Sequence, residues 1–159
     1  MGDCVWFVKE SAWLSSIEKG WGNGYVAVPK GHPAYGLNYD KVCNHVDAHW
    51  GLTYGELLSN MDWDEIPESI AGKDYYVFGF DTAHYDDTLE KWPKDKVEQH
   101  TQLLCKQFDA LINHDFRTYE EKCVAACEGM DDPISEVAAM KAALSKASPT
   151  HSLLSLIHI

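Results

Sequence analysis

The sequence predicts an α+β fold, in which a small, largely antiparallel sheet from the first half of the chain packs with helices from the second half. Short runs of aromatic and β-branched residues, separated by Gly and Pro, fill roughly the first 80 residues. From Lys94 onward, apolar residues recur at three- and four-residue spacing, as they do in amphipathic helices. The early strands have no crossover helices between them, and short connections join antiparallel strands.

Three runs in the first half have the composition of strands. These are residues 4–8 (CVWFV), 25–28 (YVAV) and 75–80 (YYVFGF), of which the last is the strongest. Residues 42–54 (VCNHVDAHWGLTY) are a fourth expected strand, in which Gly51 marks a bulge or a point of close backbone approach.

Two connections between these runs are expected to be loops. Residues 29–40 contain two Pro and two Gly, a density that favours an ordered loop over a helix. Residues 55–74 form an acidic excursion with one helical turn, and loops of this kind often cover a site.

Three helical segments follow the last strand. The first is about four turns long, and its apolar face consists of Val97, Thr101, Leu104, Phe108 and Leu111. The second ends near Gly129 and carries Phe116, Tyr119, Cys123 and Cys127. The third, within residues 131–148, begins with an acid–Pro start signal.

The predicted organisation is an α+β domain in residues 1–112, with added helices in residues 113–150 that pack on it. The chain has 159 residues, enough for one sizeable core. Its last six residues, LSLIHI, resemble the in-frame translation of a sequencing-library adapter, as expected for a gene from assembled environmental DNA. We therefore interpret residues 151–159 as a non-native tail and leave them out of the functional argument.

The charge of the chain restricts its partners. Acidic residues outnumber basic ones by 25 to 13, and the formal net charge is −12. A field of this sign repels phosphate backbones, so we expect no direct binding of nucleic acid, whereas a basic protein surface remains a suitable partner.

Cysteine usage and hydropathy predict a cytoplasmic protein without a membrane partner. The five cysteines form no CxxC pair, and their odd number favours reduced thiols over a disulfide framework. Cys123 and Cys127 stand four residues apart and are expected to be core thiols rather than metal ligands. No apolar run approaches the roughly 18–20 residues of a membrane span. A homo-oligomer remains open, because the many aromatic side chains exceed what one small core is expected to bury.

Polar residues alternate through the expected strand at residues 42–54. His45, Asp47 and His49 would share one face of the sheet, because successive side chains of a strand point to opposite faces. Two interpretations are open: a solvated sheet face, which we favour for His45 and Asp47, or part of a metal site.

A metal site is more strongly indicated for His49 together with residues that follow the strand at 75–80. If the two strands are neighbours, His49, Asp81 and His84 converge into a set of two histidines and one carboxylate. Zinc is the candidate ion, since neutral imidazole and carboxylate are its ordinary ligands.

His32 lies between Gly31 and Pro33 on a stiff loop. It is either a ligand-contacting group or an imidazole that packs the loop through backbone hydrogen bonds, and the second interpretation is favoured.

Three blocks of sequence occur in the order GYVxVPxGHPxxGxxYD, HGGLTF or HGGLTY, and GFDxAHxxD. The matching residues are Gly24–Val26, Val28-Pro29, Gly31–Pro33, Tyr35-Gly36, Tyr39-Asp40, His49, Gly51–Tyr54, Gly79–Asp81, Ala83-His84 and Asp86. In this pattern the chain resembles a family of small uncharacterised proteins of bacteriophages and prophages. Trp50 stands where that family usually has the first Gly, and His45 and Asp47 stand at its apolar or variable positions. The resemblance implies a phage-type origin and the place of a site, not a reaction.

The first functional hypothesis is a phage or mobile-element accessory protein, active against host defence in the cytoplasm of the infected bacterium. It would sequester a small polar or nucleotide-like ligand in a pocket whose polar groups and aromatic walls are His32, Tyr35, His49, Trp50, Thr53, Tyr54, Asp81 and His84. Lys30 and Lys41 are the nearby cations, so a multiply phosphorylated ligand would also need backbone N–H groups.

Two alternatives are a metal-dependent hydrolase and an acidic inhibitor. The hydrolase would bind its metal at His49, Asp81 and His84, with Asp86 or His32 as proton carrier. The inhibitor would use its negative charge to occupy the basic groove of a host-defence or CRISPR nuclease.

Overall fold

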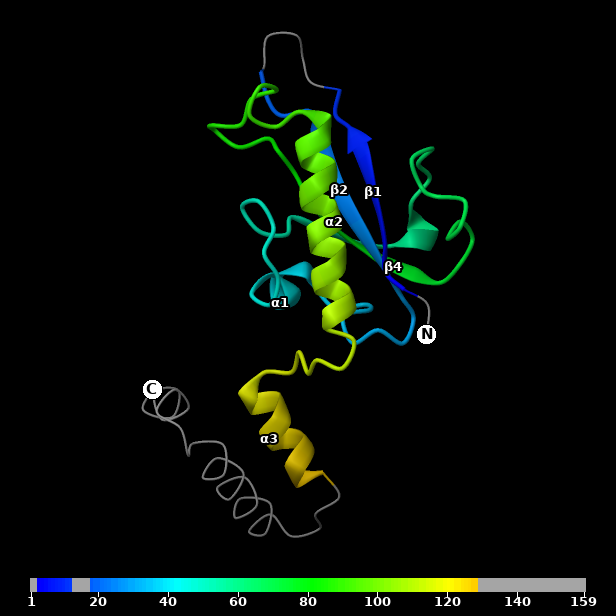
Figure 1. The fold of residues 1–159 in the computed structure, drawn as a ribbon. Helices are drawn as coiled ribbons and strands as arrows, with labels where there is room; N and C mark the ends of the chain where they lie inside the picture. The colour runs from blue at the N-terminus through cyan, green and yellow to red at the C-terminus, as the bar shows by residue number, and fades with distance from the viewer. Residues whose placement is uncertain (1–2, 13–17, 129–159) are drawn as a thin grey trace. The chain divides into compact units, whose positions relative to one another are not determined.

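The computed structural model describes residues 3–12 and 18–128 (Figure 1). Its sheet has four strands in the order β1-β2-β4-β3, with bounds Val5–Glu10 (β1), Gly22–Pro29 (β2), Tyr54–Leu57 (β3) and Tyr75–Phe80 (β4). Every neighbouring pair is antiparallel. The predicted α+β fold, with a small antiparallel sheet in the first half and helices after it, is therefore confirmed.

The helices are α1 (Tyr39–Cys43), α2 (Lys94–Ala110) and α3 (Tyr119–Cys127), and a short 3₁₀ turn, η1, spans Leu58–Asn60. The chain divides into two units, Met1–Phe116 and Arg117–Ile159. In the second unit, α3 begins with a capping box in which the side chains of Thr118 and Glu121 bond to each other's backbone N–H. The predicted third helix and tail lie outside the described residues, and the packing of added helices on the first unit stays a prediction.

The expected strand at residues 42–54 is wrong for most of its length. Asn38 caps a short helix, α1, by accepting a hydrogen bond from the N–H of Asp40, and residues 44–53 form an irregular loop. Only Tyr54 belongs to a strand. Because no strand alternation exists here, His45, Asp47 and His49 do not share a sheet face.

Helix α2 covers one face of the sheet (Figure 1). Val26 and Phe78 are paired across β2 and β4 and are fully buried beneath the helix. The Phe78 ring stacks on Phe108 of α2 at a centroid distance of 5.2 Å. Val97, Thr101, Leu104 and Phe108 are all buried, which confirms four of the five residues predicted for the apolar face. The fifth, Leu111, is the C-cap and is half-buried against the same core.

The opposite face of the sheet is covered by the acidic excursion after β3. A second apolar cluster joins Tyr25 and Val77 of the sheet to Leu58 and Ile70 of that excursion. Trp63 completes the cover, with its ring 4.9 Å from that of Tyr25. Both faces of the sheet are thus occupied by packing.

Helix α2 approaches β2 closely at Gly24. A Cβ atom on Gly24 would lie 2.0 Å from Thr101 Oγ1 and 2.6 Å from the Phe80 ring, distances that no real contact reaches. The absence of a side chain at Gly24 therefore sets the separation of helix and sheet.

None of the five cysteines, which all lie in the described residues, is in a disulfide, and two of the buried ones are Cys105 of α2 and Cys4, which contacts it. The Cys105 thiol donates a hydrogen bond to the carbonyl of Cys4, at 3.3 Å. Burial, followed by the charge of Asp109, raises the pKa of Cys105 to about 11. Burial also raises the pKa of Cys4, together with a hydrogen bond to Asp109.

We expect Cys105 to resist alkylation in the native protein, because at pH 8 only about one thiol in a thousand with such a pKa is ionised. Iodoacetamide treatment followed by peptide mass spectrometry should find Cys105 unmodified in buffer and fully modified in 6 M urea. Equal labelling of Cys105 and the half-buried Cys43 in buffer would contradict this burial.

Candidate functional site

A polar loop, residues 81–92, follows β4 and is fastened to the start of β2. The Thr82 side chain is fully buried and donates a hydrogen bond to the carbonyl of Gly22, at 2.7 Å. The Thr82 carbonyl accepts a hydrogen bond from the N–H of Gly20, at 2.9 Å. These bonds fix where the chain leaves the sheet, and hence where the next polar residues lie.

His84 and Asp87 close a tight turn within this loop. The N–H of Asp87 donates to the carbonyl of His84, at 2.9 Å. In return, Asp87 Oδ2 accepts a hydrogen bond from the N–H of His84, at 2.8 Å, and lies 2.8 Å from His84 Nδ1. The Asp87 side chain is only 3% exposed. This short-range turn therefore brings a buried carboxylate against an imidazole.

The loop at residues 44–53 supplies a second imidazole, and α2 holds that loop in place. The Gln107 side chain accepts a hydrogen bond from the N–H of Asp47, at 2.6 Å, and donates one to its carbonyl, at 3.0 Å. The His49 ring packs on Trp92, with centroids 4.0 Å apart, and its Nε2 lies 2.8 Å from Asp87 Oδ1. His49 thus contacts one carboxylate oxygen of Asp87, Oδ1, whereas His84 contacts the other, Oδ2.

His49, His84 and Asp87 form what we call the His–Asp–His cluster. One nitrogen of each imidazole and an oxygen of the carboxylate all lie within 4.8 Å of one another. Burial by itself would raise the pKa of Asp87, but hydrogen bonds from the His84 N–H and from both imidazoles outweigh it and lower the pKa. Asp87 is therefore an ionised acceptor, and each imidazole donates its facing N–H to it.

Asp81 lies beside the cluster rather than within it. Its Oδ1 is 3.6 Å from His84 Nε2 and accepts a hydrogen bond from the N–H of Ala83. Its Oδ2 accepts a hydrogen bond from the Thr53 hydroxyl, at 2.8 Å. The structure thus brings His49 and His84 together as the sequence predicts, but the carboxylate that they share is Asp87, not Asp81.

The spacing of the AHxxD pattern indicates Asp87. The Asp of this pattern lies three residues after the His, which is Asp87 in this chain, so the match to Asp86 is one residue too early. The Asp86 side chain is 77% exposed and pairs with Lys91 at 2.9 Å, so it faces solvent rather than the cluster.

Trp50 covers the cluster on one side. Its indole stacks on the His84 ring, with centroids 4.9 Å apart and planes 13° from parallel. Trp50 has a φ of 60°, at the third position of a turn in which the N–H of Gly51 bonds to the carbonyl of Ala48. Gly is the usual residue for this left-handed conformation.

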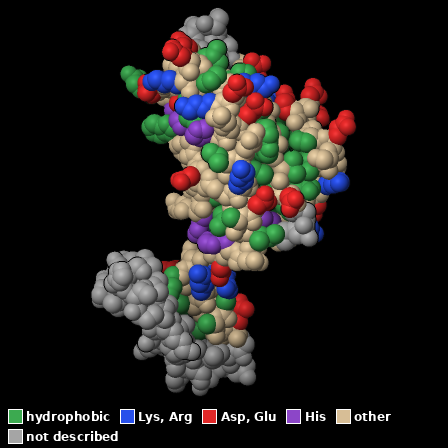
Figure 2. All heavy atoms as spheres, viewed as in Figure 1, with side chains coloured by type: hydrophobic (Ala, Val, Ile, Leu, Met, Phe, Trp, Pro, Cys, Tyr) green, Lys and Arg blue, Asp and Glu red, His purple; other side chains and the backbone are tan. Residues whose placement is uncertain are grey.

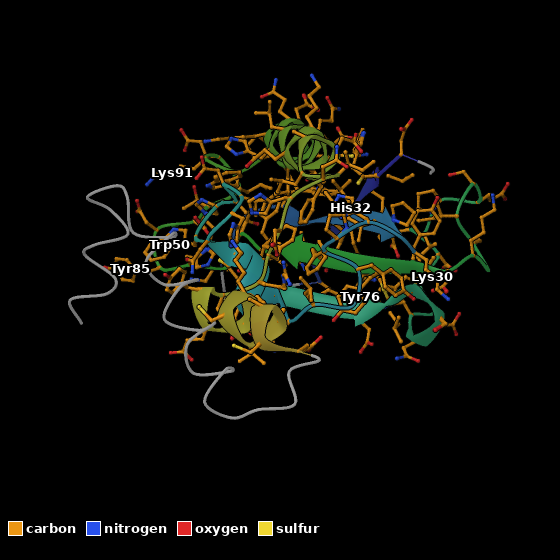
Figure 3. All side chains as sticks on the ribbon, turned by 90° about the horizontal axis from the view of Figure 1, so that it is seen from below. Lys30, His32, Trp50, Tyr76, Tyr85 and Lys91 are labelled. Carbon is orange, nitrogen blue, oxygen red and sulfur yellow. The ribbon has the colours of Figure 1, made fainter. Side chains whose placement is uncertain are left out.

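His32 does not join the cluster. It is buried, its Nδ1 accepts a hydrogen bond from the N–H of Ala34, and its Nε2 donates to the carbonyl of Phe108, at 2.7 Å. The geometry is that of an imidazole that packs the loop against α2. Figure 3 shows His32 near the middle of the sheet, away from Trp50 and Tyr85 at one end.

Tyr35 and Tyr54 also lie elsewhere. The Tyr35 hydroxyl bonds to Asp74, and its ring lies 6.0 Å from that of Tyr76, which Figure 3 shows well away from Trp50. The Tyr54 ring contacts Tyr25 in the apolar cluster on the other face of the sheet. The predicted pocket is therefore divided, and its members near the cluster are His49, Trp50, Thr53, Asp81 and His84.

Among the other imidazoles of residues 3–12 and 18–128, His45 pairs with His114, and His100 shares Trp92 with His49; Figure 2 shows histidine side chains at two places on one face of the molecule. His45 Nδ1 lies 2.9 Å from His114 Nε2, apart from His49. His100 packs edge-on against Trp92, and burial followed by the charge of Lys96 lowers the pKa of His100. No sequence pattern indicates that Trp92 would contact two imidazoles, because these contacts depend on how the loop and α2 meet.

Comparison with known proteins gives no match to a family model, to a curated protein or to a solved structure. Within the described residues, no helix combines the length and apolar character needed to cross a membrane.

Proposed function

We propose that the protein binds a small, polar, anionic ligand through a divalent metal ion held by His49, His84 and Asp87. The observation that carries the proposal is a buried, ionised carboxylate placed between nitrogen atoms of two imidazoles. Two histidines and one carboxylate are a ligand set that zinc and other first-row metals accept.

The spacing of the cluster is compatible with such an ion. Zinc–ligand bonds of about 2.0–2.1 Å place the ligand atoms of a tetrahedral site about 3.3 Å apart. The three candidate ligand atoms lie within 4.8 Å of one another, and the 2.8 Å contacts join His49 to Oδ1 and His84 to Oδ2 of Asp87, so the side chains would readjust around an ion bound to one of these oxygens. Each imidazole would bind the metal through its facing nitrogen; a neutral ring would then carry its proton on the other nitrogen, and a protonated ring would release one proton to water.

The two imidazoles of the cluster are more exposed to solvent than its carboxylate, so a solute could bind the metal from the imidazole side. The Asp87 side chain is 3% exposed, whereas those of His49 and His84 are 16% and 20% exposed. Three protein ligands leave a fourth position on a tetrahedral zinc ion, and the imidazole side is the one that a solute reaches.

The charge of the chain supports a metal-mediated site. A formal net charge of −12 repels anionic ligands unless a local cation attracts them. A divalent ion is the strongest cation that this cluster can accommodate. Lys19 adds a positive charge nearby, since its Nζ lies 3.2 Å from the carbonyl of His84.

The biological setting that we propose follows from the resemblance to phage proteins. A phage accessory protein in the bacterial cytoplasm would hold the bound ligand intact and so withdraw it from host defence. Sequestration requires affinity but no catalytic group.

A metal-dependent hydrolase is a second candidate, and the position of Asp81 favours it. This carboxylate lies 3.6 Å from His84 Nε2 and is not needed to hold the metal. In a hydrolysis, Asp81 would accept a proton from the attacking water, the water oxygen would form a bond to the substrate, and the bond to the leaving group would break as the proton passes to that group.

A calorimetric titration of the metal-free protein with zinc tests the proposal. We expect binding of one equivalent, weakened at least about 100-fold in His84→Ala and Asp87→Asn. His114→Ala is the matched control, since His114 lies outside the cluster, and should bind zinc as the unaltered protein does. Equal affinity in all four proteins would refute the metal centre.

The same zinc-loaded protein separates the two candidates. A nucleotide-like ligand is incubated with the protein and then released by heating. Recovery of the unchanged ligand supports sequestration, whereas new products that the Asp81→Asn variant does not form support the hydrolase.

A further inference from the structure

Trp50 is held in a costly conformation that the packing of the fold does not explain. Its φ of 60° is one that large L-residues rarely adopt. Its indole is nevertheless 70% exposed, so little apolar surface is removed from water in return. One face of the indole lies on the His84 ring, and the exposed fraction leaves the other face to solvent.

Tyr85 extends the same surface. It is 97% exposed and follows His84 directly in the tight turn that Asp87 closes. Figure 3 shows Trp50 and Tyr85 at the same end of the sheet. Trp50 makes the ring contact with His84, and Tyr85, the next residue along the chain, adds a second exposed ring at this end of the sheet.

We propose that the outer face of Trp50, extended by Tyr85, is a stacking surface for a nucleobase, and that the ligand is a nucleoside phosphate. This inference rests on the proposed metal centre, because the phosphate would bind the metal while the base stacks on the indole. His84 connects the two parts, since its Nδ1 faces Asp87 and its ring face carries Trp50.

The chemistry of the surroundings fits the two ends of such a ligand. Any uncharged nucleobase gains binding free energy by stacking on an aromatic ring, whichever base it is. A phosphate, by contrast, requires positive charge, which the metal and Lys19 supply at the cluster. The acidic chain is therefore expected to bind nucleotides only when the metal is present.

Calorimetry on the zinc-loaded protein tests the stacking surface with adenosine monophosphate and ribose 5-phosphate, which differ by the base. We expect the nucleotide to bind about tenfold or more tightly than the sugar phosphate. Trp50→Gly should reduce the nucleotide to the affinity of the sugar phosphate and leave the latter within about twofold. Gly accepts the turn conformation, so this variant should fold, and Trp50→Phe should restore part of the difference.

A third probe separates this inference from the metal centre. Uncharged adenosine needs no metal, and its binding is measured by calorimetry in the presence of a chelator. If zinc does not bind but adenosine binds to the unaltered protein and not to Trp50→Gly, the metal centre is refuted and the stacking surface stands. If zinc binds but the nucleotide is held no more tightly than ribose 5-phosphate, or equally by Trp50→Gly, the stacking surface is refuted.

Discussion

Replacing Asp87 with Asn is expected to lower the free energy of unfolding by about 3 kcal/mol at pH 7. The carboxylate is buried and accepts hydrogen bonds from both imidazoles and from the N–H of His84. An amide nitrogen in place of one oxygen would face these donors, and a buried donor without an acceptor is costly. Urea denaturation with a chelator present measures the difference without a contribution from bound metal.

The effect of this substitution should depend on pH in a defined direction. Asp87 has a pKa below its usual 3.8 in the folded protein, so its contribution to stability is complete above that value. It is lost as the pH falls through the folded-state pKa. The stability difference between the protein and its Asp87→Asn variant should therefore shrink in strong acid.

Asp86→Asn is the matched control, because it makes the same chemical change one residue earlier. Its carboxylate is 77% exposed and paired with Lys91, and the expected change is within about 0.5 kcal/mol. If the two variants were equally stable, the assignment of Asp87 as the organising acid of the cluster would be wrong.

Gly24→Ala is expected to destabilise the protein by about 3 kcal/mol or more. The new methyl group would lie 2.0 Å from Thr101 Oγ1 and 2.6 Å from the Phe80 ring, and both neighbours are buried. Relief requires α2 to move away from the sheet, which opens the core beneath it. Thermal and urea unfolding measure the loss.

Gly55→Ala provides the control for this clash. Gly55 also lies in a strand, but an added Cβ would meet no atom closer than 3.4 Å, so the expected change is small. Combining Gly24→Ala with Thr101→Ala removes one of the two contacts and should recover part of the loss. An equal loss at Gly24 and Gly55 would show that chain flexibility, rather than helix–sheet spacing, determines the effect.

The elements with a strong repeating pattern were predictable from sequence. The strand at residues 75–80 has its expected bounds, and the buried residues of α2 recur at the expected spacing. In each case one apolar face is buried against a continuous core, so local pattern and tertiary packing agree. The alternation in residues 42–54 was misleading, because the Asn38 cap and a tight turn determine that segment.

The candidate site was predictable only in part. His49 and His84 are brought together, and His32 takes the loop-packing position that residue statistics favoured. Asp87 was missed because its role depends on a turn that folds it back onto His84. No strand pattern reveals such a turn. The position of His49 depends further on the hydrogen bonds between Gln107 of α2 and the backbone of Asp47.

The two hydrogen bonds between Gln107 and the backbone of Asp47 couple the cluster to α2. His49 follows two residues after that anchor point, so detachment of the helix would withdraw one imidazole from Asp87. A metal ion held by both imidazoles would oppose this opening, because a ligand that binds only the closed form lowers the population of the open one. Occupancy of the site should thus slow amide hydrogen exchange along a helix that the ion does not touch.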